Sequence, residues 1–342
     1  MYNIIQRRKI WLTLSSLLVG LSIVALILWQ LNFGIDFTGG SLLEIKFLSE
    51  RPTVSEVQDK LADLSLESLT VQPVGTDSMI LRFQDISEEK HQEILKRLGR
   101  REASQEVIQS TENENVNIDE NIELSIDSEE YEIVDFETEP ITEDAPISNI
   151  EELRFDSVGP SIGQELKRKS IYAIITVLIA IVLYIAWAFR KVSKPVASWK
   201  FGLTAVITLF HDVMIVLGVF AILGRFLDME INTAFVAAIL TVLGYSVNDT
   251  IVVFDRIREN LPRSEEDFEG TVNISVNQTL RRSINTSLTT LLVLLSIFFF
   301  GGSTIRDFVL ALSIGVFVGT YSSIFLASPV LVVWERMKSR NL

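Results

Sequence analysis

Cysteine is absent from this chain of 342 residues, so it forms no disulfide and offers no thiolate for catalysis or metal binding. No cluster of histidine and carboxylate residues suggests a metal site. The phosphate-binding pattern GxxxxGK(S/T) does not occur, so the chain shows no sign of nucleotide hydrolysis. We therefore expect no metal, no other cofactor and no enzymatic activity.

Basic residues are missing from one long stretch. The formal net charge is −14, and 18 acidic residues fall between Glu102 and Glu152 without a lysine or arginine among them. A block of like charge repels anionic lipid and nucleic acid. We therefore expect no nucleic-acid partner.

Apolar residues make up 48% of the chain and gather in long blocks. A helix needs about 20 apolar residues to cross a bilayer. The sequence therefore predicts six transmembrane helices, from blocks at 10–31, 171–189, 201–223, 231–254, 288–300 (extended back toward 280) and 308–334.

The first block follows Arg7, Arg8 and Lys9, an arrangement that also describes a signal peptide. The block is too long for the apolar region of a signal peptide, and no small-residue cleavage pattern follows it. We expect it to be a retained membrane anchor.

Lysine and arginine are concentrated in alternate loops, whereas the opposite loops carry only Arg225 and Arg306. Because basic loops stay in the cytoplasm, this pattern predicts that both termini are cytoplasmic. Lys167, Arg168 and Lys169 lie just outside the second helix and conflict with the pattern, but the charge rule is weak after a long translocated segment.

Three regions follow from this topology. They are 1–31 (N-terminal tail and first helix), 32–165 (an extracytoplasmic domain) and 166–342 (five helices and C-terminal tail). The predicted fold class is thus an α-helical membrane protein with six transmembrane helices and a small α+β domain between the first two.

The extracytoplasmic region begins as a βαβα-type module. Its predicted elements are strands at 42–47 and 79–84 and helices at 54–64 and 91–98. Ser55 is a possible cap of the first of these helices. The acidic residues 102–144 are predicted to form a loosely ordered insertion, and residues 153–163 lead back to the membrane.

Three ionisable residues lie in the predicted membrane helices, where charges are costly and usually functional: Asp212, Asp249 and Arg282. Asp249 lies roughly 7 Å from the cytoplasmic end of its helix, and Arg282 begins the next helix from the same side, so we expect the two to meet. An arginine holds a nearby carboxylate ionised in a low dielectric, and separation of the pair permits protonation. This is the physics of a proton-driven switch; a static ion pair that fixes helix packing is the alternative.

Hydroxyl groups surround this position. Tyr245 lies one turn from Asp249, and Arg282, Thr286 and Thr290 form a stripe at spacing four. Such groups hold water along a proton path, or simply bond helices together.

His211 precedes Asp212 in the middle of its helix. A histidine there relays protons near neutral pH, but adjacent residues point about 100° apart and do not both face one partner. Its role therefore stays open between structure and function. Gly315 and Gly319 form a GxxxG pattern, which predicts close helix packing.

Residues 159–163, GPSIG, match the GxSxG pattern of hydrolases. With His211 they suggest an intramembrane serine protease that uses Ser161. However, Ser161 precedes a membrane helix rather than lying between a strand and a helix, and no acid–histidine arrangement accompanies it. A protease is therefore the weakest of the alternatives.

Several longer motifs resemble those of the SecD/SecF family of protein-export membrane proteins, within the resistance-nodulation-division superfamily. They are FGIDFTGG at 33–40, VGPSIG at 158–163, FHDV at 210–213, LGYSVNDTIVVFDRIREN at 243–260, NQTLRRSINTSLTTL at 277–291, FGGSTIRDF at 300–308 and GVFVGTYSSIFLASP at 315–329. They cover the membrane region nearly end to end. The pattern GYSxNDT followed by FDRIRE is similar to the SecF branch rather than to SecD.

The resemblance implies a function that composition does not. Members of the SecF branch pair with SecD beside the Sec channel and are thought to use the proton gradient, or a sodium gradient, to help preproteins across the bacterial inner (plasma) membrane after the SecA motor has pushed. The expected partners are therefore SecD, the Sec channel complex, SecA, unfolded preprotein and membrane lipid. The family's carboxylate corresponds to Asp249 and its arginine to Arg282, with Arg281 as the neighbouring alternative. The expected coupling residues are Asp249, Arg282, Asp212, His211, Tyr245 and Thr286.

Two other functions remain open. One helix, an outer domain and five further helices are the half-unit plan of the superfamily's drug and lipid exporters, but such an exporter needs a large outer domain and this one is small. A non-energetic scaffold for SecD and the channel is the other alternative. Either way, a second half-unit is expected from another polypeptide.

Overall fold

A computed structural model describes residues 1–99, 149–188 and 198–339, and the chain divides into two compact units. The helical unit comprises residues 1–39 and 159–342, and the sheet unit comprises residues 40–158. The predicted acidic insertion at 102–144 lies outside the described residues.

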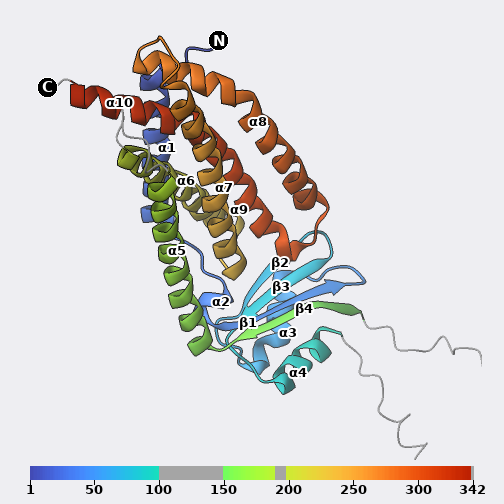
Figure 1. The fold of residues 1–342 in the computed structure, drawn as a ribbon. Helices are drawn as coiled ribbons and strands as arrows, with labels where there is room; N and C mark the ends of the chain where they lie inside the picture. Colours follow the sequence, from blue (N-terminus) through green and yellow to red (C-terminus); the bar gives the residue numbers. More distant parts are fainter. Residues whose placement is uncertain (100–148, 189–197, 340–342) are drawn as a thin grey trace, which may run out of the picture. The chain divides into compact units, whose positions relative to one another are not determined.

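The described part of the helical unit contains six helical segments long and apolar enough to cross a membrane (Figure 1). They are α1 (Arg8–Trp29), α5 (Pro160–Ala188), α6 (Ser198–Leu227), α7 (Thr233–Asn260), α8 (Phe268–Phe300) and a last segment made of α9 (Ser303–Ser322), the π-helical turn η3 (Ser323–Ala327) and α10 (Ser328–Ser339). The predicted fold class is confirmed, and the chain is a multi-pass membrane protein.

Two helices begin earlier than the apolar blocks predicted. α5 starts at Pro160, a residue suited to the first helical position because it has no N–H to leave unpaired. α8 starts after Asp267, whose carboxylate accepts a 2.7 Å hydrogen bond from the Gly270 amide. The first turns of α8 bury polar residues such as Asn273 and Ser275, which hydropathy does not detect.

Close packing of α9 against α7 depends on two glycines. A Cβ on Gly315 would overlap the side chain of Val242, and a Cβ on Gly319 would lie 3.0 Å from the Ser246 Cβ. The predicted packing role of the GxxxG pattern is therefore confirmed.

The ends of α1, α8 and α10 are tied together at one end of the bundle. The Asn273 side chain accepts hydrogen bonds from the amides of Ile4 and Ile5, and Glu269 forms ion pairs with Arg8 and Arg336. The starts of α1 and α8 and the helix α10 therefore share this end (Figure 1).

At the opposite end, the segment after α1 is fastened to the α6–α7 turn. The short helix α2 (Ile35–Thr38) follows a bridge between Phe33 and Ile231, and the Asp36 carboxylate accepts hydrogen bonds from both the amide (2.8 Å) and the hydroxyl (2.6 Å) of Thr233. Gly163 in α5 allows α2 to approach, since a Cβ there would lie 3.2 Å from the Phe37 carbonyl carbon. The motifs FGIDFTGG at 33–40 and VGPSIG at 158–163 are thus in contact.

In the sheet unit, residues 40–99 and 149–158 form a four-stranded antiparallel sheet with strand order β2-β3-β1-β4. Its elements are β1 (Gly40–Phe47), α3 (Val54–Leu61) with the 3-10 turn η1 (Ala62–Leu64), β2 (Thr70–Val74), β3 (Ser78–Phe83), α4 (Glu88–Leu98) and β4 (Ile150–Val158). This βαββαβ order is the ferredoxin-like arrangement.

Two details of the predicted module were wrong. The βαβα pattern missed β2, an edge strand that contains Pro73, and β4, whose polar residues hide its alternation. The cap of α3 is Thr53 rather than Ser55: the Thr53 hydroxyl accepts from the Glu56 amide, and the Glu56 carboxylate accepts from the Thr53 amide.

Candidate functional site

Asp249 lies buried in the helical unit, and both of its carboxylate oxygens accept hydrogen bonds from serines. Oδ1 accepts a 2.7 Å bond from Ser283 on α8, and Oδ2 accepts from Ser323, the first residue of η3. The side chain is 7% exposed. The carboxylate is therefore surrounded by neutral donors from two other elements.

Asp212 on α6 is a second buried carboxylate. Its Oδ2 accepts hydrogen bonds from Ser246 on α7 (2.5 Å) and from Ser322 on α9 (2.8 Å). Its Oδ1 lies 2.9 Å from Nδ1 of His211. We expected neighbours on one helix to diverge, but the two side chains bend toward each other because His211 is buried and needs a partner for its ring nitrogen.

The two carboxylates are linked by consecutive serines. Ser322 ends α9 and donates to Asp212, while Ser323 begins η3 and donates to Asp249. Adjacent helical residues point about 100° apart, so the two serines of one turn donate hydrogen bonds to two different helices, α6 and α7. π-helical turns are rare and are found frequently at functional sites.

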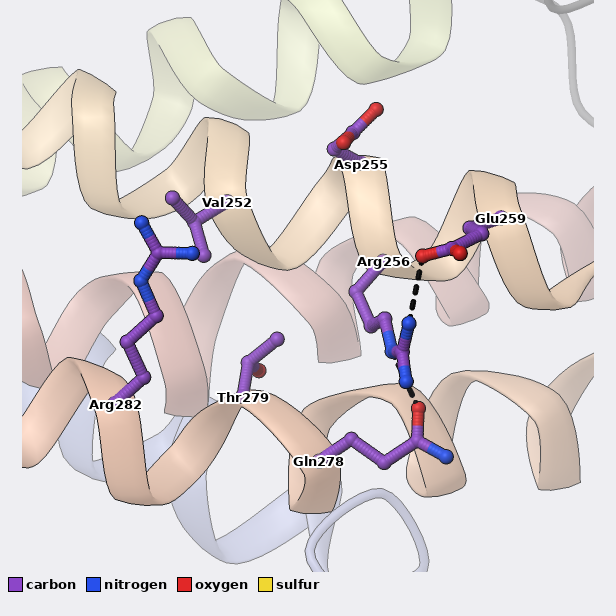
Figure 2. Close-up of a pocket in the computed structure, with 7 residues that line it drawn as sticks. All are labelled: Val252, Asp255, Arg256, Glu259, Gln278, Thr279 and Arg282. Atoms are coloured by element: carbon purple, nitrogen blue, oxygen red, sulfur yellow. Dashed lines mark hydrogen bonds and ion pairs between the residues drawn. The ribbon is translucent and has the colours of Figure 1, made fainter.

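Arg282 does not occupy the position beside Asp249, which belongs to Ser283. Arg282 is exposed and lines an open pocket of about 280 Å³ on α7 and α8, and Figure 2 shows its guanidinium beside Val252. Arg282 and Ser283 are adjacent on α8, so their side chains point about 100° apart. Arg282 nevertheless has a Coulombic interaction with Asp249, and Arg281 is also exposed.

The other residues of the Arg282 pocket are mostly polar and pair among themselves. Arg256 donates to Gln278 and forms an ion pair with Glu259, both at 2.6 Å (Figure 2). The remaining lining residues are Asp255 and Thr279.

Tyr245 and Thr286 differ in their hydrogen-bond partners and in their exposure. The Tyr245 hydroxyl is 3.1 Å from the Ser287 hydroxyl, which in turn is 2.5 Å from that of Thr320 on α9. Thr286 is exposed, and its hydroxyl donates to carbonyls of its own helix, as those of Thr289 and Thr290 do. Tyr245 thus belongs to the hydrogen-bonded interior, and Thr286 lies on the outside of α8.

Three serines of the site were missed in the sequence: Ser283, Ser322 and Ser323. Serine is common in membrane helices, so one serine carries little signal. The consecutive serines of TYSSIF, inside the last apolar block at 308–334, were the feature that could have marked the site.

Ser161, the residue of the GxSxG pattern, is exposed in the first turn of α5. Gly163 of the same pattern contacts α2, which accounts for one of its two glycines by packing.

One face of α7 carries exposed residues that are not suited to lipid. Thr241, Gly244 and Asn248 are exposed at helical spacing, and Arg282 on α8 is exposed as well. Polar and charged groups at membrane depth usually face protein or water.

Comparisons with known proteins agree on one family. The family model "Protein export membrane protein SecD/SecF, C-terminal" matches residues 138–337, and the model "SecD/SecF GG Motif" matches residues 30–47.

Relatives of similar length carry one description. The chain is 42% identical to the protein translocase subunit SecF of Thermobaculum terrenum, over 98% of this chain and 94% of that one, and 36% identical to that of Haemophilus influenzae, over 94% and 83%. Among solved structures it resembles SecDF, a translocon-associated membrane protein from Thermus thermophilus, with 30% identity and a TM-score of 0.73. That match covers 98% of this chain but only 39% of the larger SecDF chain.

Proposed function

The chain belongs to the SecF family of protein translocase subunits, and on this premise we propose that it acts with SecD to couple the proton gradient across the bacterial inner membrane to a late step of preprotein translocation. The proposal involves no chemical reaction on the preprotein. Its energy source is a proton that crosses the bundle by way of a buried carboxylate.

The observation that carries the proposal is the environment of Asp249. Its two oxygens contact hydroxyl donors from α8 and η3, and no cation is in direct contact with it among the described residues. A carboxylate held in this way takes up or releases a proton without first breaking an ion pair. Each protonation step changes which groups donate and which accept, so it changes the bonds between helices.

The connection between α7 and the sheet unit supports a mechanical role. Asp249 lies on α7, and the first residue of α7, Thr233, is bonded to Asp36. Only three residues separate Asp36 from Gly40, where β1 begins. Movement of α7 is therefore passed through a short, tied segment to the strand that starts the extracytoplasmic domain.

We assign the exposed face of α7 and α8 to the contact with SecD. The exposed face of α7 and α8 offers Gly244 for close approach, Asn248 for hydrogen bonding and Arg282 for a carboxylate. The solved SecDF chain is more than twice as long as the part that this chain matches, in agreement with a second half-unit. In the proposal, a SecD helix with an acidic side chain covers this face.

The remaining partners follow from the family. In the proposal, the preprotein contacts the extracytoplasmic domain. The Sec channel and the SecA motor belong to the neighbouring complex. The exposed apolar sides of α5 and α8 face lipid. We assign the end of the bundle that holds the start of α1 and α10 to the cytoplasm, because lysine and arginine are concentrated in the loops on that side.

The test is preprotein export in cells that lack their own copy of the subunit. The cells are complemented with wild type, Asp249→Asn or Asp228→Asn at matched membrane levels. Asp228 is an exposed carboxylate on the α6–α7 turn, so its variant is the matched control. We expect Asp228→Asn to restore export and Asp249→Asn to assemble with SecD without restoring it.

Full export with Asp249→Asn would contradict coupling and leave the scaffold function. Export that follows an imposed sodium gradient at constant pH would replace the proton with sodium at the same site.

A further inference from the structure

Ser322 and Ser323 are neighbours in the chain, yet each donates a hydrogen bond to the carboxylate of a different helix. Ser322 donates to Asp212 on α6, and Ser323 donates to Asp249 on α7. All four side chains are buried. The arrangement places two carboxylates on one turn of the backbone.

We propose that Ser322 and Ser323 are positioning residues that join Asp212 and Asp249 into one hydrogen-bonded unit, in which the state of one carboxylate sets the proton affinity of the other. The proposal deepens the function proposed above and rests on it for the use made of the proton. It assigns Asp212 to the regulation of Asp249.

Each serine has two acceptors and a single proton to donate. The Ser322 hydroxyl lies 2.8 Å from Asp212 Oδ2 and 3.1 Å from the Gly319 carbonyl oxygen. The Ser323 hydroxyl contacts Asp249 and lies 3.0 Å from the Thr320 carbonyl oxygen. When the carboxylate is ionised, the serine hydroxyl donates its hydrogen bond to the carboxylate. When the carboxylate is protonated, the hydroxyl donates to the helix carbonyl instead. Each serine is therefore a two-position switch.

The two switches share their backbone. Ser323 is the first residue of η3, where the hydrogen-bonding pattern changes from α to π, so movement at Ser322 is passed directly to Ser323. A second link runs through α7, because Ser246 donates to Asp212 from a position three residues before Asp249 on the same helix. Each carboxylate is thus bonded to an element that carries or contacts the other.

The ionisable groups around the pair are few. His211 on α6 is bonded to Asp212, and Tyr321 on α9 lies beside His211, with ring centroids 6.1 Å apart. Tyr245 on α7 is bonded to Ser287, and Arg282 on α8 interacts with Asp249 through its charge. α1 adds the neutral Ser15 at 3.0 Å from the Tyr321 hydroxyl. Serine variants leave all of these groups in place.

The test is an infrared titration of the full chain with its SecD partner in lipid nanodiscs. The carboxyl band of Asp249 is assigned by its loss in Asp249→Asn, and its midpoint pH is compared between wild type and the variants. Ser323→Ala removes a direct donor to Asp249, whereas Ser322→Ala removes a donor to Asp212 only. Ser313→Ala is the matched control, since this buried hydroxyl of α9 bonds the Val309 carbonyl of its own helix.

We expect Ser323→Ala to move the midpoint upward by about one pH unit, because a lost donor no longer stabilises the ionised form. Ser322→Ala moves it downward by a smaller amount, because Asp212 without this donor holds its proton more tightly and the loss of its negative charge makes Asp249 easier to ionise. Ser322→Cys, which keeps the size of the side chain with a much weaker donor, shifts it as Ser322→Ala does. Ser322→Thr retains the hydroxyl and restores the wild-type midpoint, and Ser313→Ala leaves it unchanged.

A midpoint that moves in Ser323→Ala but stays in both Ser322→Ala and Ser322→Cys overturns the proposal, since the carboxylates then titrate independently. An equal shift in Ser313→Ala also overturns it, because general loosening of α9 would then be the cause. The titration reads protonation and not export, so a failure here is distinct from recovery of export by Asp249→Asn, which would reject the proposed function alone.

Discussion

Asp249 on α7 accepts a 2.7 Å hydrogen bond from Ser283 on α8. A second contact between the same helices, from Tyr245 to Ser287, lies one turn away on each of them. The two contacts hold α7 against α8 at two levels. Because one of them ends on a carboxylate, the strength of this helix contact depends on whether a proton is present.

Removal of the Ser283 hydroxyl is expected to impair export. Ser283→Ala deletes a hydrogen bond to a buried carboxylate, worth about 1.5–3 kcal/mol when the acceptor is charged. Export is measured by complementation, and thermal unfolding in detergent gives the loss of stability. The control is Ser296→Ala on the same helix, whose hydroxyl is exposed and bonds the Leu292 carbonyl of its own backbone. Equal export defects in Ser283→Ala and Ser296→Ala would show that the Asp249 contact is not the cause.

Asp36 is expected to stabilise the start of α7. Asp36→Ala removes the acceptor of both the amide and the hydroxyl of Thr233, and loss of such a capping contact costs about 1 kcal/mol. We expect a lower unfolding temperature together with weaker export, since the tie between α7 and β1 is loosened. Asp36→Asn keeps one acceptor oxygen and has a smaller effect on both. Normal export in a clearly destabilised Asp36→Ala protein would remove this segment from the coupling path.

Substitution by alanine is expected to have opposite effects on stability at a glycine packed against another helix and at an exposed glycine. Gly315→Ala forces a Cβ into Val242 and is expected to destabilise the isolated chain by about 1–3 kcal/mol. A Cβ on Gly244 meets nothing within 4 Å, so Gly244→Ala is neutral or stabilising in the isolated chain. Co-purification then tests the proposed SecD face: Gly244→Ala is expected to weaken recovery of SecD. Unchanged recovery would move the interface away from this part of α7.

A buried ion pair near the chain termini is expected to be sensitive to removal of one partner. Nζ of Lys200 on α6 lies 2.6 Å from Oε2 of Glu335 on α10, and the lysine side chain is only 4% exposed. Lys200→Met leaves the glutamate without this cation, which costs about 3–5 kcal/mol for a fully buried pair and less here because Glu335 is partly exposed. Thermal unfolding is expected to show partial recovery in the double variant Lys200→Met/Glu335→Gln. Additive losses in the double variant would mean that the two residues do not act as a pair.

The helices were predictable because bilayer length is a strong constraint on sequence. Six apolar blocks gave six spanning segments, but the polar first turns of α8 and the start of α5 at Pro160 lay outside what hydropathy detects. In the sheet unit the two alternating strands were found. β2 and β4 were missed, because Pro73 interrupts one pattern and charged residues cover the other.

The site was predictable in its carboxylates and not in their partners. A buried charge is rare enough to single out Asp212 and Asp249. The direction of a side chain changes by about 100° with each residue, so helix register alone did not separate Arg282 from Ser283. The partners of Ser322 and Ser323 were not predicted, because these serines bond carboxylates on α6 and α7, which lie far away in the sequence.

The central claim is that a proton passes through Asp249, and proton flux tests it most directly. The chain and SecD are reconstituted in liposomes that enclose a pH-sensitive dye, and a pH gradient is imposed while a preprotein crosses the Sec channel. The account predicts a flux that depends on the preprotein, that is lost in Asp249→Asn and that is kept in Ser296→Ala. An equal flux in wild type and Asp249→Asn would contradict it.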